Sequence, residues 1–260
     1  MFVGIDIGSV TTKALILDEH KNILAFSLMP TEYDRHKSGE ECLELALGKA
    51  GRSRDDIKSI VSTGYGRRSF TGSDKVLPEI ICHAKGTKFL LPETRTIIDI
   101  GGQDSKIIEL DGEGNIVRFE MNDKCAAGTG RFLEVLTERL LDLPLEELGP
   151  LSVKAKDPVT LTSVCTVFAE TEIISLLSEN QSKEDIAYGM HQAIAKRVIS
   201  MGAAGQISYQ EPIVFSGGVA KNIGVVKAIE EVLGKKVVVL KEPQITAALG
   251  AAIAAEELSE

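Results

Sequence analysis

The chain contains one segment twice, and no other feature of the sequence restricts its fold as strongly. Residues 3–17 and 97–110 each consist of an apolar run, the letters Asp-Ile-Gly, and a second apolar run with a lysine at the same position. Apolar runs on both sides of a glycine turn predict two adjacent strands. A third strand is expected after each copy, over residues 22–28 and 115–120. Two similar three-stranded units in one chain indicate two similar lobes.

Regular apolar spacing predicts that helices fill much of the remaining chain. They are expected over residues 40–50, 130–141, 166–178, 183–201, 223–233 and 244–257, with short strands over 57–63, 213–215 and 236–240. Ser182 is the expected N-cap of the fourth of these helices. We therefore expect an α/β protein with a first lobe over residues 1–93 and a second over 94–245. The last helix, about residues 246–260, is expected to pack back on the first lobe.

Composition indicates the class of protein and the partners that it is not expected to bind. Hydrophobic residues make up 43% of the chain and charged residues 26%, which is typical of a globular protein. The longest apolar run, residues 245–255, is too short to span a bilayer. No secretion leader is apparent before the first strand, so a cytoplasmic protein without a membrane segment is expected. The net charge of −9 argues against a general affinity for nucleic acid.

Each copy of the repeat carries residues suited to binding a nucleotide phosphate. Asp6 and Asp99 follow an apolar strand, and their carboxylates suit a magnesium ion or its waters. The glycines allow close approach of a phosphate, to which turn amides and hydroxyls donate. Gln103 is a candidate to orient the attacking water. The remaining candidates for phosphate contact are Ser9, Val10, Thr11, Thr12, Lys13, Gly101 and Gly102.

A third glycine-rich segment, Ser216-Gly-Gly-Val-Ala-Lys-Asn222, lies between an expected strand and an expected helix. Glycines at such a position permit close approach of a flat or anionic ligand. Taken alone, the same pattern also fits a tight strand-to-helix connection.

Together the three segments, residues 6–13, 99–106 and 216–222, resemble the two phosphate motifs and the adenosine motif of the actin, sugar-kinase and heat-shock-chaperone superfamily. The resemblance covers nearly the whole chain. It implies two ribonuclease-H-like lobes that close on ATP and Mg²⁺ in a cleft between them. The residues that it suggests for the adenosine side are Gly217, Gly218, Asn222, Gln244 and, for the ribose, Glu170.

The four cysteines divide into two kinds. Their spacing contains no CxxC pair, which excludes a zinc ribbon. Cys42 lies on an amphipathic helix and Cys82 in an apolar stretch, so both are expected in the core. Cys125 and Cys165 each precede an expected helix, whose N-terminus would stabilise a thiolate.

The segments around these two cysteines, residues 122–132 and 163–172, resemble the activators of 2-hydroxyacyl-CoA dehydratases and the related BadF/BadG/BcrA/BcrD ATPases, which include subunits of benzoyl-CoA reductases. The resemblance implies that Cys125 and Cys165 from two identical subunits bind one [4Fe–4S] cluster on the dimer axis. Two thiolates per subunit supply the four that the cluster needs, and twofold symmetry brings identical ligands together. A pair of buried structural thiols is the alternative.

The activity that the resemblance implies is an ATPase coupled to electron transfer. Such a homodimer takes one electron from ferredoxin or flavodoxin and passes it to a dehydratase or related reductase. One rival is a small-molecule kinase of the same fold without a cluster. Another is a nucleotide-gated binding module without redox function. The chain is short for a sugar kinase and shows no acceptor-binding insertion.

Overall fold

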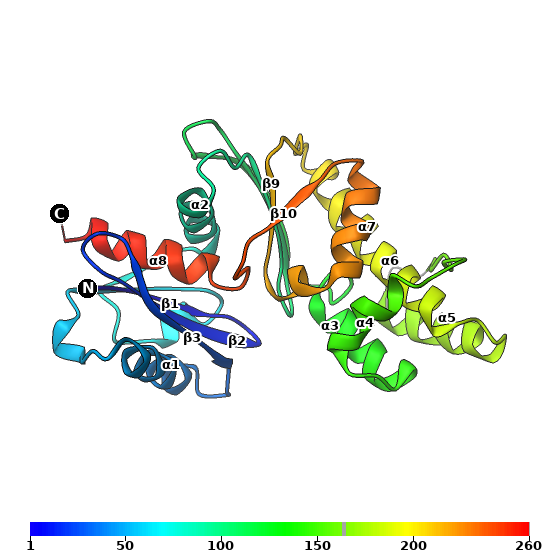
Figure 1. Ribbon diagram of the computed structural model, residues 1–260, viewed down its shortest axis with the longest axis horizontal. Coiled ribbons are helices and arrows are strands. Elements are labelled where there is room, and N and C mark those ends of the chain that lie inside the picture. Colours follow the sequence, from blue (N-terminus) through cyan, green and yellow to red (C-terminus); the bar gives the residue numbers. More distant parts are fainter. Residues whose placement is uncertain (163–164, 260) are drawn as a thin grey trace. The chain divides into compact units, whose positions relative to one another are not determined.

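The computed structural model describes residues 1–162 and 165–259 (Figure 1), and the chain divides into two compact units. The first contains Met1–Thr94, Leu110–Ile116 and the described residues from Gln244 onward. The second contains Arg95–Glu109 and the described residues of Val117–Pro243. The short segment Leu110–Ile116 was predicted in the second lobe but groups with the first unit, since it forms the tip of a hairpin that packs on a helix of that unit.

The first unit is built on a five-stranded sheet of order β3-β2-β1-β4-β5. The central strand β1 pairs antiparallel with β2 and parallel with β4. The strands are β1 (Phe2–Ile7), β2 (Thr11–Leu17), β3 (Ile23–Pro30), β4 (Ser59–Thr63) and β5 (Lys75–Val76). Its helices are α1 (Arg35–Ala50), α2 (Glu79–Leu90) and α8 (Thr246–Glu257), with 3₁₀ turns at Arg54–Asp56 and Arg67–Ser69.

Helix α8 contacts β1 and α2, as Figure 1 shows. Alanine and glycine make up most of α8, and nearly all of its side chains are buried. Small side chains let a helix approach its neighbours closely and still exclude water. The apolar run that is too short for a membrane is therefore a core helix. In the described part of the chain, no helix combines the length and apolarity needed to cross a membrane.

The second unit has a sheet of the same connectivity, of order β10-β9-β6-β7-β8. Its central strand β6 pairs antiparallel with β7 and parallel with β9, as β1 does with β2 and β4. The strands are β6 (Thr96–Ile100), β7 (Ser105–Leu110), β8 (Ile116–Asn122), β9 (Ile213–Ser216) and β10 (Val237–Val239). The sequence repeat thus corresponds to a repeat of the whole sheet, and the predicted α/β class is confirmed.

Helices provide most of the core of the second unit. Buried apolar side chains of α6, such as Met190 and Ile194, join Ile98 and Phe215 of the sheet in one cluster. The helices are α3 (Gly130–Leu136), α4 (Leu145–Ser152), α5 (Thr166–Ser178), α6 (Lys183–Ala204) and α7 (Ile223–Leu233), with a 3₁₀ turn at Gly218–Lys221. The single helix predicted over residues 130–141 instead changes to a π-helical turn at Thr137–Leu141.

Candidate functional site

In the first unit, the Asp-Ile-Gly segment forms a tight turn with an ion pair at its base. Asp6 on β1 lies opposite Lys13 on β2, and Lys13 Nζ is 3.0 Å from Asp6 Oδ2. Both side chains are about nine-tenths buried. The turn is closed by the Gly8 amide, which donates to the Thr11 carbonyl at 3.1 Å. The lysine therefore holds the carboxylate in one orientation.

The second unit repeats this arrangement. Asp99 on β6 lies opposite Lys106 on β7, and the Gly101 amide donates to the Asp104 carbonyl at 2.9 Å. Lys106 Nζ lies 2.9 Å from Asp104 Oδ2 and 3.5 Å from Asp99 Oδ2. Asp104 takes the position that Thr11 has in the first copy, so this turn carries a second carboxylate. Gln103, at the tip of the turn, is exposed.

Both copies of the repeat also share a glycine after the parallel strand, a correspondence that was not predicted from the sequence. Gly64 follows β4 and Gly217 follows β9, with φ of 88° and 86°. A Cβ atom at Gly64 would lie 2.3 Å from Asp6 Oδ1, and one at Gly217 would lie 2.3 Å from the Ile100 carbonyl oxygen. Only glycine fits both the backbone conformation and the space. Extending the repeat from the hairpins to the parallel strands would have revealed Gly64.

Asn222 lies within the predicted adenosine segment, but its side chain has partners inside the protein. Its Oδ1 accepts from the amides of Gly224 and Val225 at 2.9 and 3.2 Å and so caps α7. Its Nδ2 donates to Nε2 of His191 at 3.2 Å. Asn222 thus fixes the start of α7 directly after the glycines at positions 217 and 218.

His191 is fully buried on α6, and burial lowers its pKa to about 3. The ring is therefore neutral near pH 7, so Nε2 accepts from Asn222 and the proton resides on Nδ1. His191 therefore has a structural role in the core of the second unit.

The remaining adenosine candidates lie on different elements. Gln244 belongs to the first unit, just before α8, whereas Gly217 and Gly218 belong to the second. Glu170 is half-buried on α5. Their roles stay predictions.

The structure separates the cysteines into buried and accessible pairs. Cys42 on α1 and Cys82 on α2 are fully buried, which confirms the expectation for them. Burial raises the pKa of both thiols, that of Cys82 to about 12. Cys125 is half-buried and Cys165 is exposed.

Cys125 lies in a turn after β8 that the side chain of Asn122 shapes. Nδ2 of Asn122 donates to the carbonyls of Cys125 and Ala127 at 2.8 and 3.1 Å. The Cys125 amide donates back to Oδ1 at 3.2 Å. Cys165 occupies the N-cap position of α5, as predicted, whereas residues 163 and 164 of its predicted motif lie outside the described residues.

The donor chemistry of the two accessible thiols fits an iron–sulfur cluster shared by two chains. Thiolates are the usual ligands of such clusters. Among the described residues, no three histidine, cysteine or acidic side chains are grouped so that they could hold a metal ion. One chain supplies two accessible thiols, so a four-thiolate centre requires a second chain.

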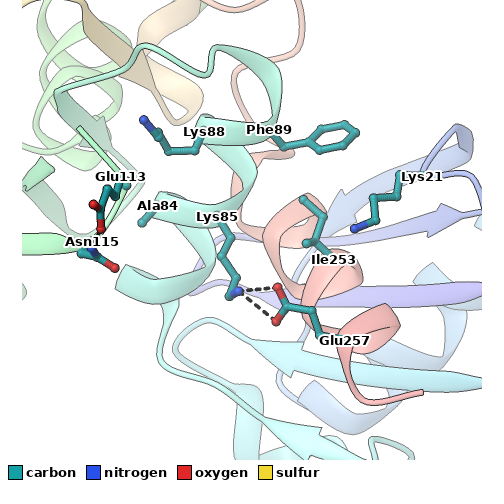
Figure 2. A pocket seen from close by; sticks show the side chains of 10 residues that line it. Lys21, Ala84, Lys85, Lys88, Phe89, Glu113, Asn115, Ile253 and Glu257 are labelled. Carbon is teal, nitrogen blue, oxygen red and sulfur yellow. Dashed lines mark hydrogen bonds and ion pairs between the residues drawn. The ribbon is translucent and has the colours of Figure 1, made fainter. Parts of the chain in front are cut away.

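A pocket of about 380 Å³ also opens in the first unit, next to α2 and α8. Lys85 and Glu257 both line it and form an ion pair, drawn in Figure 2, with a shortest distance of 2.6 Å. The tip of the β7–β8 hairpin, with Glu113 and Asn115, forms another wall. None of the predicted phosphate, adenosine or cysteine residues lines this pocket.

The chain is similar to known proteins along nearly its whole length. The model of the BadF/BadG/BcrA/BcrD ATPase family matches residues 3–255. The activator of lactoyl-CoA dehydratase of Anaerotignum propionicum is 47% identical over 259 residues, covering 99% of this chain and 98% of that protein.

Two solved structures superpose closely. The activator of the 2-hydroxyisocaproyl-CoA dehydratase from Clostridium difficile with bound ADPNP gives a TM-score of 0.93 at 45% identity, covering 100% of this chain and 96% of that one. Component A of the (R)-2-hydroxyglutaryl-CoA dehydratase of Acidaminococcus fermentans gives 0.94 at 40% identity, covering 99% and 98%. A ROK family glucokinase from Streptomyces griseus, at 16% identity and a TM-score of 0.58 over 98% and 99% of the chains, shares the fold alone.

Proposed function

Because the chain belongs to the BadF/BadG/BcrA/BcrD ATPase family, we propose that it couples ATP hydrolysis to one-electron transfer to a 2-hydroxyacyl-CoA dehydratase or a related reductase. Two similar relatives are named as dehydratase activators, and the family is one of ATPases. The observation that carries the redox part is the pair of accessible thiols, Cys125 and Cys165, in a chain whose other two thiols are buried. Ferredoxin or flavodoxin is the proposed electron donor.

We assign the ATPase chemistry to the two repeated turns. Asp6 and Asp99 are the proposed magnesium-side carboxylates, since their lysine partners hold them in one orientation. The turn amides and hydroxyls bind phosphate oxygens. The exposed tip residue Gln103 orients the attacking water.

Changing Gln103 to alanine tests this assignment. The variant should lose about a hundredfold in the rate of ATP hydrolysis, because a misplaced attacking water reacts slowly. Its affinity for ADPNP, measured by calorimetry, should stay unchanged. Equal hydrolysis rates in both proteins would remove Gln103 from the mechanism.

The thiols of Cys125 and Cys165 from two subunits would hold the [4Fe–4S] cluster, which takes up and releases one electron at a time when bound. The Asn122 side chain fixes the turn of Cys125, and Cys165 lies at the N-cap of α5. Beside Cys165, the side chains of Val167 and Phe168 are each 67% exposed. Two neighbouring apolar side chains that are exposed in one chain support the proposal that a second subunit covers this surface.

Anaerobic purification tests the redox part. The protein should be brown and contain about four iron and four sulfide per dimer. Cys125→Ser and Cys165→Ser should each lose the colour, whereas Cys42→Ser, in the core of the other unit, should keep it. A colourless, oxygen-stable wild type with normal ATPase activity would reject the electron-transfer function. If such a protein transferred phosphate to an acceptor, the kinase alternative would hold.

A further inference from the structure

The first turn of α3 is hydrogen-bonded to the phosphate turn of the second unit. The Gly130 amide donates to the Gly101 carbonyl at 2.8 Å, and the Arg131 amide donates to the Gly102 carbonyl at 2.8 Å. Amides at a helix N-terminus have no partner within the helix, so they are free to bind such carbonyls. Any displacement of the turn at 101–102 therefore acts directly on the start of α3.

The cysteine turn is attached to the same helix start. Thr129 Oγ1 donates to the Ala126 carbonyl at 2.7 Å, which ties the residue before α3 to the one after Cys125. At its other end the turn is held to the end of β8 by the Asn122 side chain, which binds Cys125 and Ala127. Residues 122–131 thus form a short, hydrogen-bonded connection between the cysteine and the phosphate turn.

Residue 130 has little room for a side chain beside this connection. A Cβ atom there would lie 3.1 Å from the Gly101 carbonyl oxygen and 3.4 Å from Gly102 Cα. It would also lie 3.2 Å from Cγ2 of Val219, which belongs to the predicted adenosine segment. Glycine at this position lets the helix start contact the phosphate turn and the adenosine segment at once.

We propose that Gly130 is a positioning residue that transmits the nucleotide state from the turn at 101–102 to the turn that holds Cys125. The inference rests on the proposed function, because it assigns a route by which ATP acts on a cluster ligand. Loss of the terminal phosphate shifts the two glycine carbonyls, and the amides of Gly130 and Arg131 follow. The Cys125 turn then changes shape, since Asn122 keeps its other end on β8.

The test measures the alkylation rate of Cys125 by iodoacetamide in cluster-free protein, read by mass spectrometry with ADP or ADPNP bound. In the wild type, the two rates should differ by at least about fivefold, the lower end of ordinary coupling between sites. Gly130→Ala should bring their ratio close to one. Asn122→Ala should do the same while the affinity for both nucleotides is unchanged, because the side-chain hydrogen bonds of Asn122 to the described residues go to the cysteine turn. Gly48→Ala on α1, where a Cβ atom would meet nothing within 4 Å, should keep the wild-type ratio.

Buried Cys42 reports on folding in the same experiment, since it reacts only when the protein opens. If Cys42 reacts in a variant, amide exchange of residues 123–131 in the wild type decides instead: a difference between the ADP and ADPNP states supports the inference, and equal exchange overturns it. A wild-type ratio of one, or an unchanged ratio in both variants, also overturns it. Nucleotide affinity is measured on the same preparations, and iron content is measured on each protein before its cluster is removed. If the wild type binds nucleotide and iron but Cys125 is alkylated equally fast with ADP and with ADPNP, only this inference is refuted. If the wild type binds neither nucleotide nor iron, the proposed function is refuted.

Discussion

At the scale of single residues, His191 makes stability depend on pH. Burial holds its folded-state pKa at about 3, below the ordinary value of 6.5. The neutral ring thus contributes stability that is complete above pH 6.5 and is lost as pH falls from 6.5 toward 3. At pH 5 the loss should be about 2 kcal/mol, from 1.4 kcal/mol per pH unit. Urea unfolding should be measured at pH 7 and pH 5. Between these pH values the free energy of unfolding of His191→Gln, which cannot titrate, should fall by about 2 kcal/mol less than that of the wild type. Equal losses would contradict the assignment.

The ion pairs of the chain differ strongly in what their removal should cost. Lys106 is almost fully buried between Asp99 and Asp104. Lys106→Met leaves a buried carboxylate without its ammonium, so the free energy of unfolding should fall by about 3 kcal/mol. Lys236, whose side chain is 86% exposed and pairs with Glu230, is the matched control. Lys236→Met should change stability by less than about 0.5 kcal/mol, and equal effects in urea unfolding would refute the distinction.

At the scale of elements, regular apolar spacing predicted the helices that show it, and a capping signal marked the start of one of them. Ser182 caps α6 as expected, with its Oγ accepting from the Asp185 amide at 3.1 Å. Helices α2 and α4 were not predicted. Pro150 lies inside α4, and Gly86 and Thr87 interrupt the apolar pattern of α2. Such helices are stabilised by packing against the rest of the fold, which a local pattern does not contain.

Helix α7 offers a test of capping. Asn222→Ala removes the acceptor for two amides, which should cost about 1 kcal/mol and speed amide exchange at Gly224 and Val225. Asn222→Asp keeps the acceptor and should retain slow exchange at both amides. If both variants exchange alike, the cap does not determine the start of the helix.

At the scale of the whole molecule, the repeat predicted two similar three-stranded units, and the structure extends each to a five-stranded sheet of the same strand order. The proposal that Cys125 and Cys165 bind one cluster came from a resemblance and not from their spacing, since the two lie far apart in the chain. The grouping of Leu110–Ile116 with the first unit was also not predictable, because it depends on contacts such as that of Lys88 Nζ with the Gly112 carbonyl at 3.2 Å.

A shared cluster would determine whether the chain is a monomer or a dimer. If two chains complete the four-thiolate centre, sedimentation of cluster-loaded protein should give roughly twice the 28.0 kDa chain mass. Cys165→Ser should sediment as a monomer, because the shared ligand set is broken. Cys42→Ser should remain a dimer. If the Cys165→Ser protein still dimerises, contacts such as those of Val167 and Phe168 hold the subunits together. The dimer would then form without the cluster and bind it afterwards.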